Sequence, residues 1–212
     1  MRDNNYTTFL QKHSEQWFEN ICKEYTNVIN FFKLPKNEVL IDLGCGQGHL
    51  LKVLKDNNFT NFYGLDFDCK ILKNNFVKDR VLNGNIIKLP FKNNSISNII
   101  IMGTLHHLNS IDEYKICLVE CERILKKDGM LYIYEPANTI IRKISAFFLM
   151  SPISNLFTYS KNMRKLVEIE WQEYNYWLKN LENFYKIISD LNFQIILKKE
   201  KLTKLYIILK KG

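Results

Sequence analysis

The residues with the clearest chemical potential lie in one short stretch, where Asp42 precedes glycines at positions 44, 46 and 48. Only glycine lets a backbone turn sharply enough for a ligand to contact its amide groups. The G-x-G-x-G spacing is one residue shorter than the G-x-G-x-x-G pattern of dinucleotide sites. Asp42 would repel a diphosphate but attract a cation, such as the ammonium of an amino-acid moiety. The stretch therefore predicts a binding loop for a polar cofactor that carries a positive charge.

Two elements must position this loop. Residues 39–43 are almost continuously apolar, as expected of a parallel strand that is buried on both faces. Residues 49–54 return to apolar positions at helical spacing. The sequence therefore predicts a strand, a tight glycine turn and a helix.

This arrangement resembles the first motif of the class I S-adenosylmethionine methyltransferases, and the resemblance covers residues 36–135 well. It implies an α/β fold of the Rossmann-like, doubly wound type, with a seven-stranded sheet, mostly parallel with the last strand antiparallel, and helices on both faces. It also implies that the loop binds S-adenosyl-L-methionine (SAM). The loop residues that we place in the cofactor site are Asp42, Gly44, Cys45, Gly46 and Gly48.

A second acid follows the next expected strand, residues 61–65. Asp66 stands at the tip of that strand, 18 residues after Gly48, where a carboxylate can accept hydrogen bonds from both ribose hydroxyls. We place Asp66 and its neighbour Phe67 in the cofactor site. Asp68 could instead cap the helix that follows.

The third expected strand, residues 80–84, leads into Asn85 and Ile86. The resembled family usually carries here an acid that hydrogen-bonds the adenine amino group. The carbonyl oxygen of Asn85 can still accept that bond, and Ile86 would pack against the adenine face. Both residues are therefore assigned to the cofactor site.

Two adjacent histidines follow the fourth expected strand, residues 97–102. In an open parallel sheet the ligand crevice lies beyond the carboxyl ends of the central strands, so Met102 and Gly103 are expected to face the cofactor. His106 and His107 are the candidate catalytic bases, since a histidine pKa near ~6.5 suits removal of a hydroxyl proton. Adjacent residues point about 100° apart on a helix, so at most one histidine is expected to face the acceptor. A base is optional, because alignment alone can supply ~7 kcal/mol or more.

The acceptor side is expected to draw on several distant segments. Residues 14–32 have helical spacing, with Ser14 as N-cap, and in the resembled family an N-terminal helix often covers the pocket. Glu135, after a fifth strand at 130–134, could contact the acceptor or could be a loop residue. The candidate substrate-binding residues are His13, Trp17, His107 and Glu135, although for Trp17 we favour a place in the core.

Residues 139–167 contain several basic side chains and no acid. The apolar residues at positions 140, 141, 144, 147 and 148 share one face of a helix. That face could cover an apolar or anionic acceptor or rest on a membrane surface, but we favour an ordinary core-facing helix. After a helix at 111–126 and a turn at Asp128 and Gly129, the remaining predictions are a helix at 175–191 and a hairpin of strands 193–198 and 202–209 that turns at 198–201.

The length of 212 residues fits a single domain. We divide it into an N-terminal helical cap (1–35), a cofactor-binding core (36–135), a variable acceptor-side insertion (137–177) and a C-terminal helix and hairpin (178–212). The net charge of +8 is spread over both halves, which indicates a Lys-rich surface and makes nucleic acid an unlikely partner. Five cysteines lack paired spacing, so reduced thiols and no metal site are expected. The polar N-terminal residues and the lack of a long apolar run predict a cytoplasmic protein.

The sequence as a whole predicts transfer of a methyl group from SAM to a small-molecule acceptor, apolar or anionic, with O-methylation slightly favoured and S-adenosylhomocysteine released. Either a monomer or a homodimer is compatible with this activity. Methylation of tRNA or another RNA is an alternative enzyme activity. A SAM-binding scaffold or partner-dependent subunit without catalysis is a different class of function, which Asn85 would fit. An NAD-dependent oxidoreductase is disfavoured by the glycine spacing.

Overall fold

The computed structural model describes residues 15–142, 144, 147 and 158–212. The strands are β1 (Leu40–Leu43), β2 (Phe62–Asp66), β3 (Val81–Asn83), β4 (Ile96–Met102), β5 (Leu125–Pro136), β6 (Phe193–Lys201) and β7 (Lys204–Lys211). The helices are α2 (Glu15–Phe32), α3 (His49–Asp56), α4 (Cys69–Lys73), α5 (Ile111–Ile124), α7 (Thr158–Lys179) and α8 (Leu181–Asp190), with short 3₁₀ turns η1 (Lys78–Arg80) and η2 (Leu105–His107).

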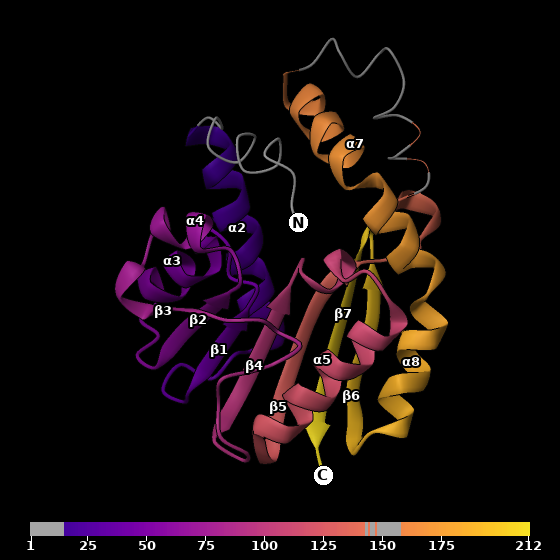
Figure 1. The fold of residues 1–212 in the computed structure, drawn as a ribbon. Helices are drawn as coiled ribbons and strands as arrows, with labels where there is room; N and C mark the ends of the chain where they lie inside the picture. The colour runs from indigo at the N-terminus through magenta and orange to yellow at the C-terminus, as the bar shows by residue number, and fades with distance from the viewer. Residues whose placement is uncertain (1–14, 143, 145–146, 148–157) are drawn as a thin grey trace.

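The strands form one seven-stranded sheet in the order β3-β2-β1-β4-β5-β7-β6 (Figure 1). Neighbouring strands from β3 to β5 pair in parallel, whereas β7 runs antiparallel to both β5 and β6. The chain moves outward in one direction through β2 and β3 and in the other through β4 and β5, so a topological switch point lies between β1 and β4. The predicted fold class is confirmed.

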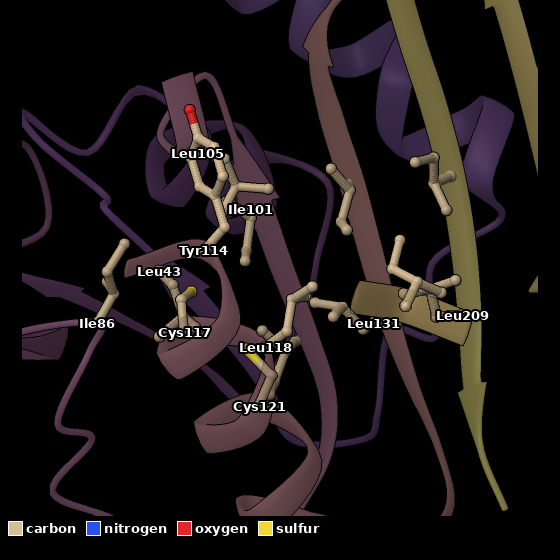
Figure 2. Close-up of a cluster of buried hydrophobic side chains, with 14 of the residues drawn as sticks. Leu43, Ile86, Ile101, Leu105, Tyr114, Cys117, Leu118, Cys121, Leu131 and Leu209 are labelled. Atoms are coloured by element: carbon tan, nitrogen blue, oxygen red, sulfur yellow. The ribbon is translucent and has the colours of Figure 1, made fainter. Parts of the chain in front are cut away.

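Helices cover both faces of the sheet, and alternate strand residues supply the two cores. On one face Leu43, Ile101 and Leu131 pack with α5 and α8. Figure 2 shows Cys117, Leu118 and Cys121 of α5 gathered against strand residues of this core. On the other face the remaining strand residues pack with α2 and α3. The central strands are therefore buried on both sides, which explains why they are apolar almost throughout.

The second half of the chain differs from the sequence prediction in four places. The predicted helix 175–191 is wrong as a single element, because α7 ends and α8 begins around Asn180. The hairpin turn also lies later than predicted, since β6 pairs with β7 as far as Lys201 and the chain turns at Leu202, with φ +55°. The helix α5 stops at Ile124, because Leu125 already pairs with Ile96 of the sheet. The predicted turn at Asp128, with φ +62°, lies inside β5 as an irregularity.

The predicted core-facing helix face at residues 140–148 is also wrong where the structure describes it. Ile140, Ile141, Ile144 and Phe147 expose 75, 50, 63 and 81% of their surface. Phe148 lies outside the described residues, as do His13 and the predicted cap Ser14. The apolar positions of this segment thus face away from the core, whereas their basic neighbour Arg142 is half-buried over the ring of Tyr174.

All five cysteines are free thiols, and Cys117 and Cys121 are fully buried in the core, as predicted. Among the described residues, no helix combines the length and the apolar character needed to cross a membrane.

Candidate functional site

The glycine loop joins the carboxyl end of β1 to α3 and is held by main-chain hydrogen bonds. The amides of Gly44 and Cys45 both donate to the carbonyl of Leu65, at 2.7 and 3.1 Å. Gly44, Gly46 and Gly48 have φ values of +83, +51 and +82°, a region that other residues rarely adopt. A side chain at Gly44 would also place its Cβ 2.3 Å from the side chain of Thr104. The loop geometry therefore requires glycine.

Asn75 supports this loop from below, and the sequence analysis missed it. It is 2% exposed, and its amide nitrogen donates to the carbonyl of Gly46 at 2.9 Å. Its side-chain oxygen accepts a bond from the amide of Val77 at 2.8 Å. A Cβ on Gly48 would lie 2.2 Å from that oxygen. No local sequence pattern marks Asn75, since only its burial beneath the loop reveals its role.

Asp66 links the second strand to the glycine loop. Its two carboxylate oxygens accept hydrogen bonds from the amides of Gly46 and Asp68, each at 2.9 Å. Because each carboxylate oxygen can accept more than one bond, Asp66 keeps acceptor capacity for hydroxyl groups of a ligand. Asp68 caps α4 through the amides of Lys70 and Ile71, as predicted.

Asp42 lies beneath the same loop and is 3% exposed. Burial, and next the negative charge of Asp66, raise the pKa of Asp42 to about 8. Two carboxylates thus share one buried region at the ends of adjacent strands. A bound cation would favour the charged form of Asp42 and relieve the repulsion between them.

A cavity of about 250 Å³ opens beyond the carboxyl ends of β1, β2 and β4. Its lining residues are Gly44, Asp66, Phe67, Asn85, Ile86, Ile87, Thr104, His107, Leu108, Asn109, Glu113 and Glu173. It therefore brings together six of the predicted site residues from four separate segments. A second cavity of about 400 Å³ is lined by residues near the opposite ends of the strands, such as Glu38 and Ser97, and by none of the predicted site residues.

Several predicted cofactor residues do not line the cavity. Asp42 belongs to β1, and Gly46 and Gly48 belong to the loop that follows it, behind the lining residue Gly44. The side chain of Cys45 is buried against Gly64, where a Cβ would lie 2.6 Å from the Cys45 sulfur. Met102 belongs to the core on the α2 and α3 face.

Two further predicted residues have defined main-chain roles. The Gly103 amide donates to the carbonyl of Tyr134 at 2.9 Å. The side-chain oxygen of Asn85 accepts the amide of Ile87 at 3.1 Å, while Ile86 is 8% exposed and packs into the core. The Asn85 oxygen that we assigned to adenine is therefore already engaged by the backbone and has only its remaining acceptor capacity.

Glu135, at the end of β5, fixes the turn that carries the two histidines. One of its oxygens accepts the amides of Thr104 and Leu105, both at 2.7 Å, and the other lies 2.8 Å from Nδ1 of His106. The side chain is 1% exposed, and burial raises its pKa to about 7 although the two backbone bonds lower it. Its observed role is thus to hold the loop.

The two histidines occupy different positions. His107 lines the cavity, and its Nδ1 atom is hydrogen-bonded to the Glu173 carboxylate. His106 is 3% exposed and stacks on Tyr174, with ring centroids 4.5 Å apart. Only His107 is therefore placed where an acceptor could reach it.

Sequence reasoning missed the acids of α7. Nε2 of His106 lies 3.9 Å, and Nε2 of His107 3.7 Å, from the carboxylate of Glu170. Glu170 and Glu173 are spaced i, i+3 and so share a helix face, which was the available signal. The pairing with residues 106 and 107 could not be read from the sequence, because more than 60 residues separate the two segments.

The predicted N-terminal contacts cannot be located from the described residues. His13 lies outside them, and Trp17 is within α2 but its side chain is not described. Both stay predictions.

Comparisons with known proteins place this site in context. Residues 41–133 match a family model described as a methyltransferase domain. An uncharacterised protein of Methanocaldococcus jannaschii is 33% identical over 129 residues, which are 61% of this chain and 53% of that protein. The chain thus spans about half the length of this curated relative. A demethylmenaquinone methyltransferase of Staphylococcus aureus is 26% identical over 208 residues, with 83% of each chain covered.

The fold is shared with solved structures. A protein of Methanococcus maripaludis, described as a candidate S-adenosyl-L-methionine-dependent methyltransferase, superposes with a TM-score of 0.62 and 20% identity, covering 92% of this chain and 87% of that one.

Proposed function

We propose, from the match of residues 41–133 to a methyltransferase domain and from the geometry of the site, that this chain is a class I SAM-dependent methyltransferase that transfers the methyl group of SAM to a small-molecule acceptor. The C–S bond of the sulfonium breaks and a bond from the methyl carbon to an acceptor oxygen forms. The acceptor hydroxyl loses its proton, and S-adenosylhomocysteine leaves. Each following step assigns a part of SAM to residues around the cavity.

The observation that carries the proposal is the pair of buried acids beneath the glycine loop. Asp66 would accept the ribose hydroxyls with the acceptor capacity that its two backbone bonds leave. The ammonium of the methionine moiety would restore the charge of Asp42, whose pKa is raised to about 8 in the free chain. A cationic, hydroxyl-bearing cofactor therefore matches both carboxylates, whereas a diphosphate would add negative charge beside them.

The remaining cavity wall is assigned to adenine and to the acceptor. Ile86 would contact the adenine ring, and Phe67, which is 54% exposed, would cover the nucleoside from the open side. The acceptor would then enter from the side of His107 and Glu173. In a metal-free site His107 would take the acceptor proton, with Glu173 orienting its ring.

A small acceptor fits the dimensions of the site better than a polymer. The cavity of about 250 Å³ lies just below the usual range of small-molecule sites, which begins at about 300 Å³. The Staphylococcus relative is named for a small molecule, demethylmenaquinone. We favour O-methylation slightly, because a histidine on the cavity wall suits removal of a hydroxyl proton.

Calorimetric titration with SAM tests the cofactor assignment. Asp66→Ala should bind SAM about 10- to 150-fold more weakly than the unchanged chain, because hydrogen bonds to a charged group contribute ~1.5–3 kcal/mol. The matched control is Asp68→Ala, which removes a nearby acid that caps α4 but does not line the cavity. It should lower stability by about 1 kcal/mol and leave SAM affinity nearly unchanged. Equal affinities of the two variants would refute the ribose assignment.

Turnover is then measured as S-adenosylhomocysteine released with a panel of phenols, hydroxy acids, quinols and unmodified tRNA. Release with a small hydroxyl compound supports the proposal. Release with tRNA alone would replace it by RNA methylation, and tight SAM binding without turnover on the whole panel would replace it by a non-catalytic SAM-binding role.

A further inference from the structure

Three side chains from two distant segments converge beside the cavity. They are His106 and His107 of η2 and Glu170 of α7, and their nearest ligand-type atoms all lie within 4.8 Å of one another. Glu170 is 4% exposed, and its two oxygens lie 3.9 Å from Nε2 of His106 and 3.7 Å from Nε2 of His107. Among the described residues this is the group whose atoms could surround one ion.

Both imidazole rings are oriented by a carboxylate on their other nitrogen. Nδ1 of His106 lies 2.8 Å from the carboxylate of Glu135, and Nδ1 of His107 is bonded to Glu173. A carboxylate on the far nitrogen is the usual support of a metal-binding histidine, since it fixes the tautomer and turns the other nitrogen toward the ion. Here the carboxylates of Glu135 and Glu173 hold the two rings so that both Nε2 atoms face Glu170.

The charges around this group favour a cation. Glu135, Glu170 and Glu173 bring three carboxylates into contact with the two rings. Burial lowers the pKa of the Arg142 guanidinium, and the charge of the nearby Glu170 carboxylate partly opposes that shift; Arg142 supplies one positive charge. With neutral histidines, the described carboxyl groups of the cluster outnumber its one described positive charge, which favours a bound cation.

We propose that His106, His107 and Glu170 bind one divalent transition-metal ion through two Nε2 atoms and a carboxylate oxygen. Bonds of about 2.0–2.1 Å in a tetrahedral arrangement separate ligand atoms by about 3.3 Å. The ligand atoms of the three side chains lie 3.7 Å to at most 4.8 Å apart, so these separations need to shrink by about 0.4–1.5 Å. Two imidazoles and a carboxylate suit Zn²⁺, Co²⁺ or Fe²⁺ better than Mg²⁺ or Ca²⁺, which prefer oxygen ligands. This site differs from the sequence-based expectation of no metal.

The position of the site suggests its use. His107 lines the cavity, so an ion bound by it would lie at the cavity wall, with its open position available to water or to an acceptor oxygen. A bound cation lowers the pKa of a coordinated hydroxyl group, and it would replace His107 as the means of deprotonating the acceptor. This role rests on the proposed function, whereas metal binding itself rests on side-chain geometry alone.

Metal binding is tested with the full chain after treatment with a chelator and removal of the chelator. ZnCl₂ and CoCl₂ are titrated in separate calorimetric experiments, and the Co²⁺ sample is followed by visible absorption. One ion per chain is expected, with a raised unfolding temperature and Co²⁺ bands in the range of four- to five-coordinate sites. Glu170→Gln and His107→Gln should each weaken binding by a factor of ~10 or more, with circular dichroism showing that both variants are folded.

The matched control is Glu168→Gln, an exposed acid on the same helix two residues before Glu170. It should bind Zn²⁺ and Co²⁺ as the unchanged chain does. No bound ion in the unchanged chain at 0.1 mM metal, or equal affinity in all variants, would overturn the inference. SAM affinity is measured on the same samples. A chain that binds metal but not SAM would keep this site and refute the proposed function, and the reverse result would refute only the site.

Discussion

The two ends of the cavity are built by different kinds of contact. At the cofactor end Asp66 accepts two backbone amides, and the glycine loop donates its own amides to the carbonyl of Leu65. At the acceptor end the main contacts join side chains, with each histidine bonded to a carboxylate 29 or 66 residues away along the chain.

This difference in contacts predicts which end of the cavity accepts amino-acid substitutions. The hydrogen bonds that hold the glycine loop end on its main chain, with partners that include the Leu65 carbonyl and the Asp66 and Asn75 side chains, and glycine permits the dihedral angles that they require. The acceptor end depends on which acids β5 and α7 present to η2, and a single substitution there alters both charge and shape. We therefore expect the cofactor end to tolerate few changes of backbone and the acceptor end to determine the substrate.

The largest expected effect concerns the acceptor end. Glu135→Ala should lower the free energy of unfolding by about 3–5 kcal/mol, because it leaves two buried amides and Nδ1 of His106 without their acceptor. Urea denaturation measures the change. Glu113→Ala serves as control, since that acid accepts one exposed amide, of Asn109, and should cost about 1 kcal/mol. Similar losses in both variants would show that the turn η2 is not held by side chains.

The next effect concerns the cofactor end. Gly44→Ala should cost about 3 kcal/mol of stability, from backbone strain at φ +83° and from the clash with Thr104. The Cβ of Gly46→Ala would meet no atom within 4 Å. This variant should therefore lose only about 1 kcal/mol of stability, from backbone strain alone. The difference between the two variants separates the effect of backbone strain from that of the clash. Urea denaturation measures the free energy of unfolding of each variant. If Gly46→Ala were as damaging as Gly44→Ala, strain alone would explain the glycines.

A pH dependence tests the two acids beneath the loop. The folded chain keeps a proton on Asp42 up to a pKa of about 8, whereas the unfolded chain loses it near the ordinary value of 3.8. The folded state therefore binds more protons over this interval, and its free energy of unfolding should fall as pH rises from about 4 to about 8.

Asp42→Asn should reduce that slope and should be more stable than the unchanged chain at pH 8 by about 1 kcal/mol or more. Glu135, with its pKa near 7, contributes a slope of the same sign in both proteins, so the difference between them isolates Asp42. The measurement is urea denaturation at pH 5, 6.5 and 8. The affinity of the unchanged chain for SAM should rise over the same interval, since a cationic ligand prefers ionised Asp42. A pH-independent affinity would place the ammonium elsewhere.

The smallest effect is expected on the segment before α7. Ile144→Ser should change stability by less than about 0.5 kcal/mol, because that side chain is 63% exposed. Leu118→Ala, in the fully buried core of α5, is the comparison and should cost about 2–5 kcal/mol. Thermal unfolding followed by circular dichroism measures both. A large loss with Ile144→Ser would restore the core-facing interpretation of residues 140–148.

The sequence by itself determined the glycine loop and the strands on either side of it, and the family resemblance implied the class of the sheet. Residues 39–54 carry a buried strand, a glycine turn and a helix within 16 positions, and local chain geometry requires that these be adjacent in space. The tip of the next parallel strand must lie beside the loop, so Asp66 could be assigned from its position alone. The cap at Asp68 and the five parallel strands followed from equally local patterns.

Only the tertiary structure decided the acceptor end. The contacts of His106 and His107 with Glu135, Glu170 and Glu173 depend on how β5 ends and on how α7 crosses the turn η2. The helical period of α7 shows which of its residues share a face, but not which distant segment that face meets. The support from Asn75 and the outward apolar face near Ile144 are likewise products of packing, because neither arises from bonds within one segment.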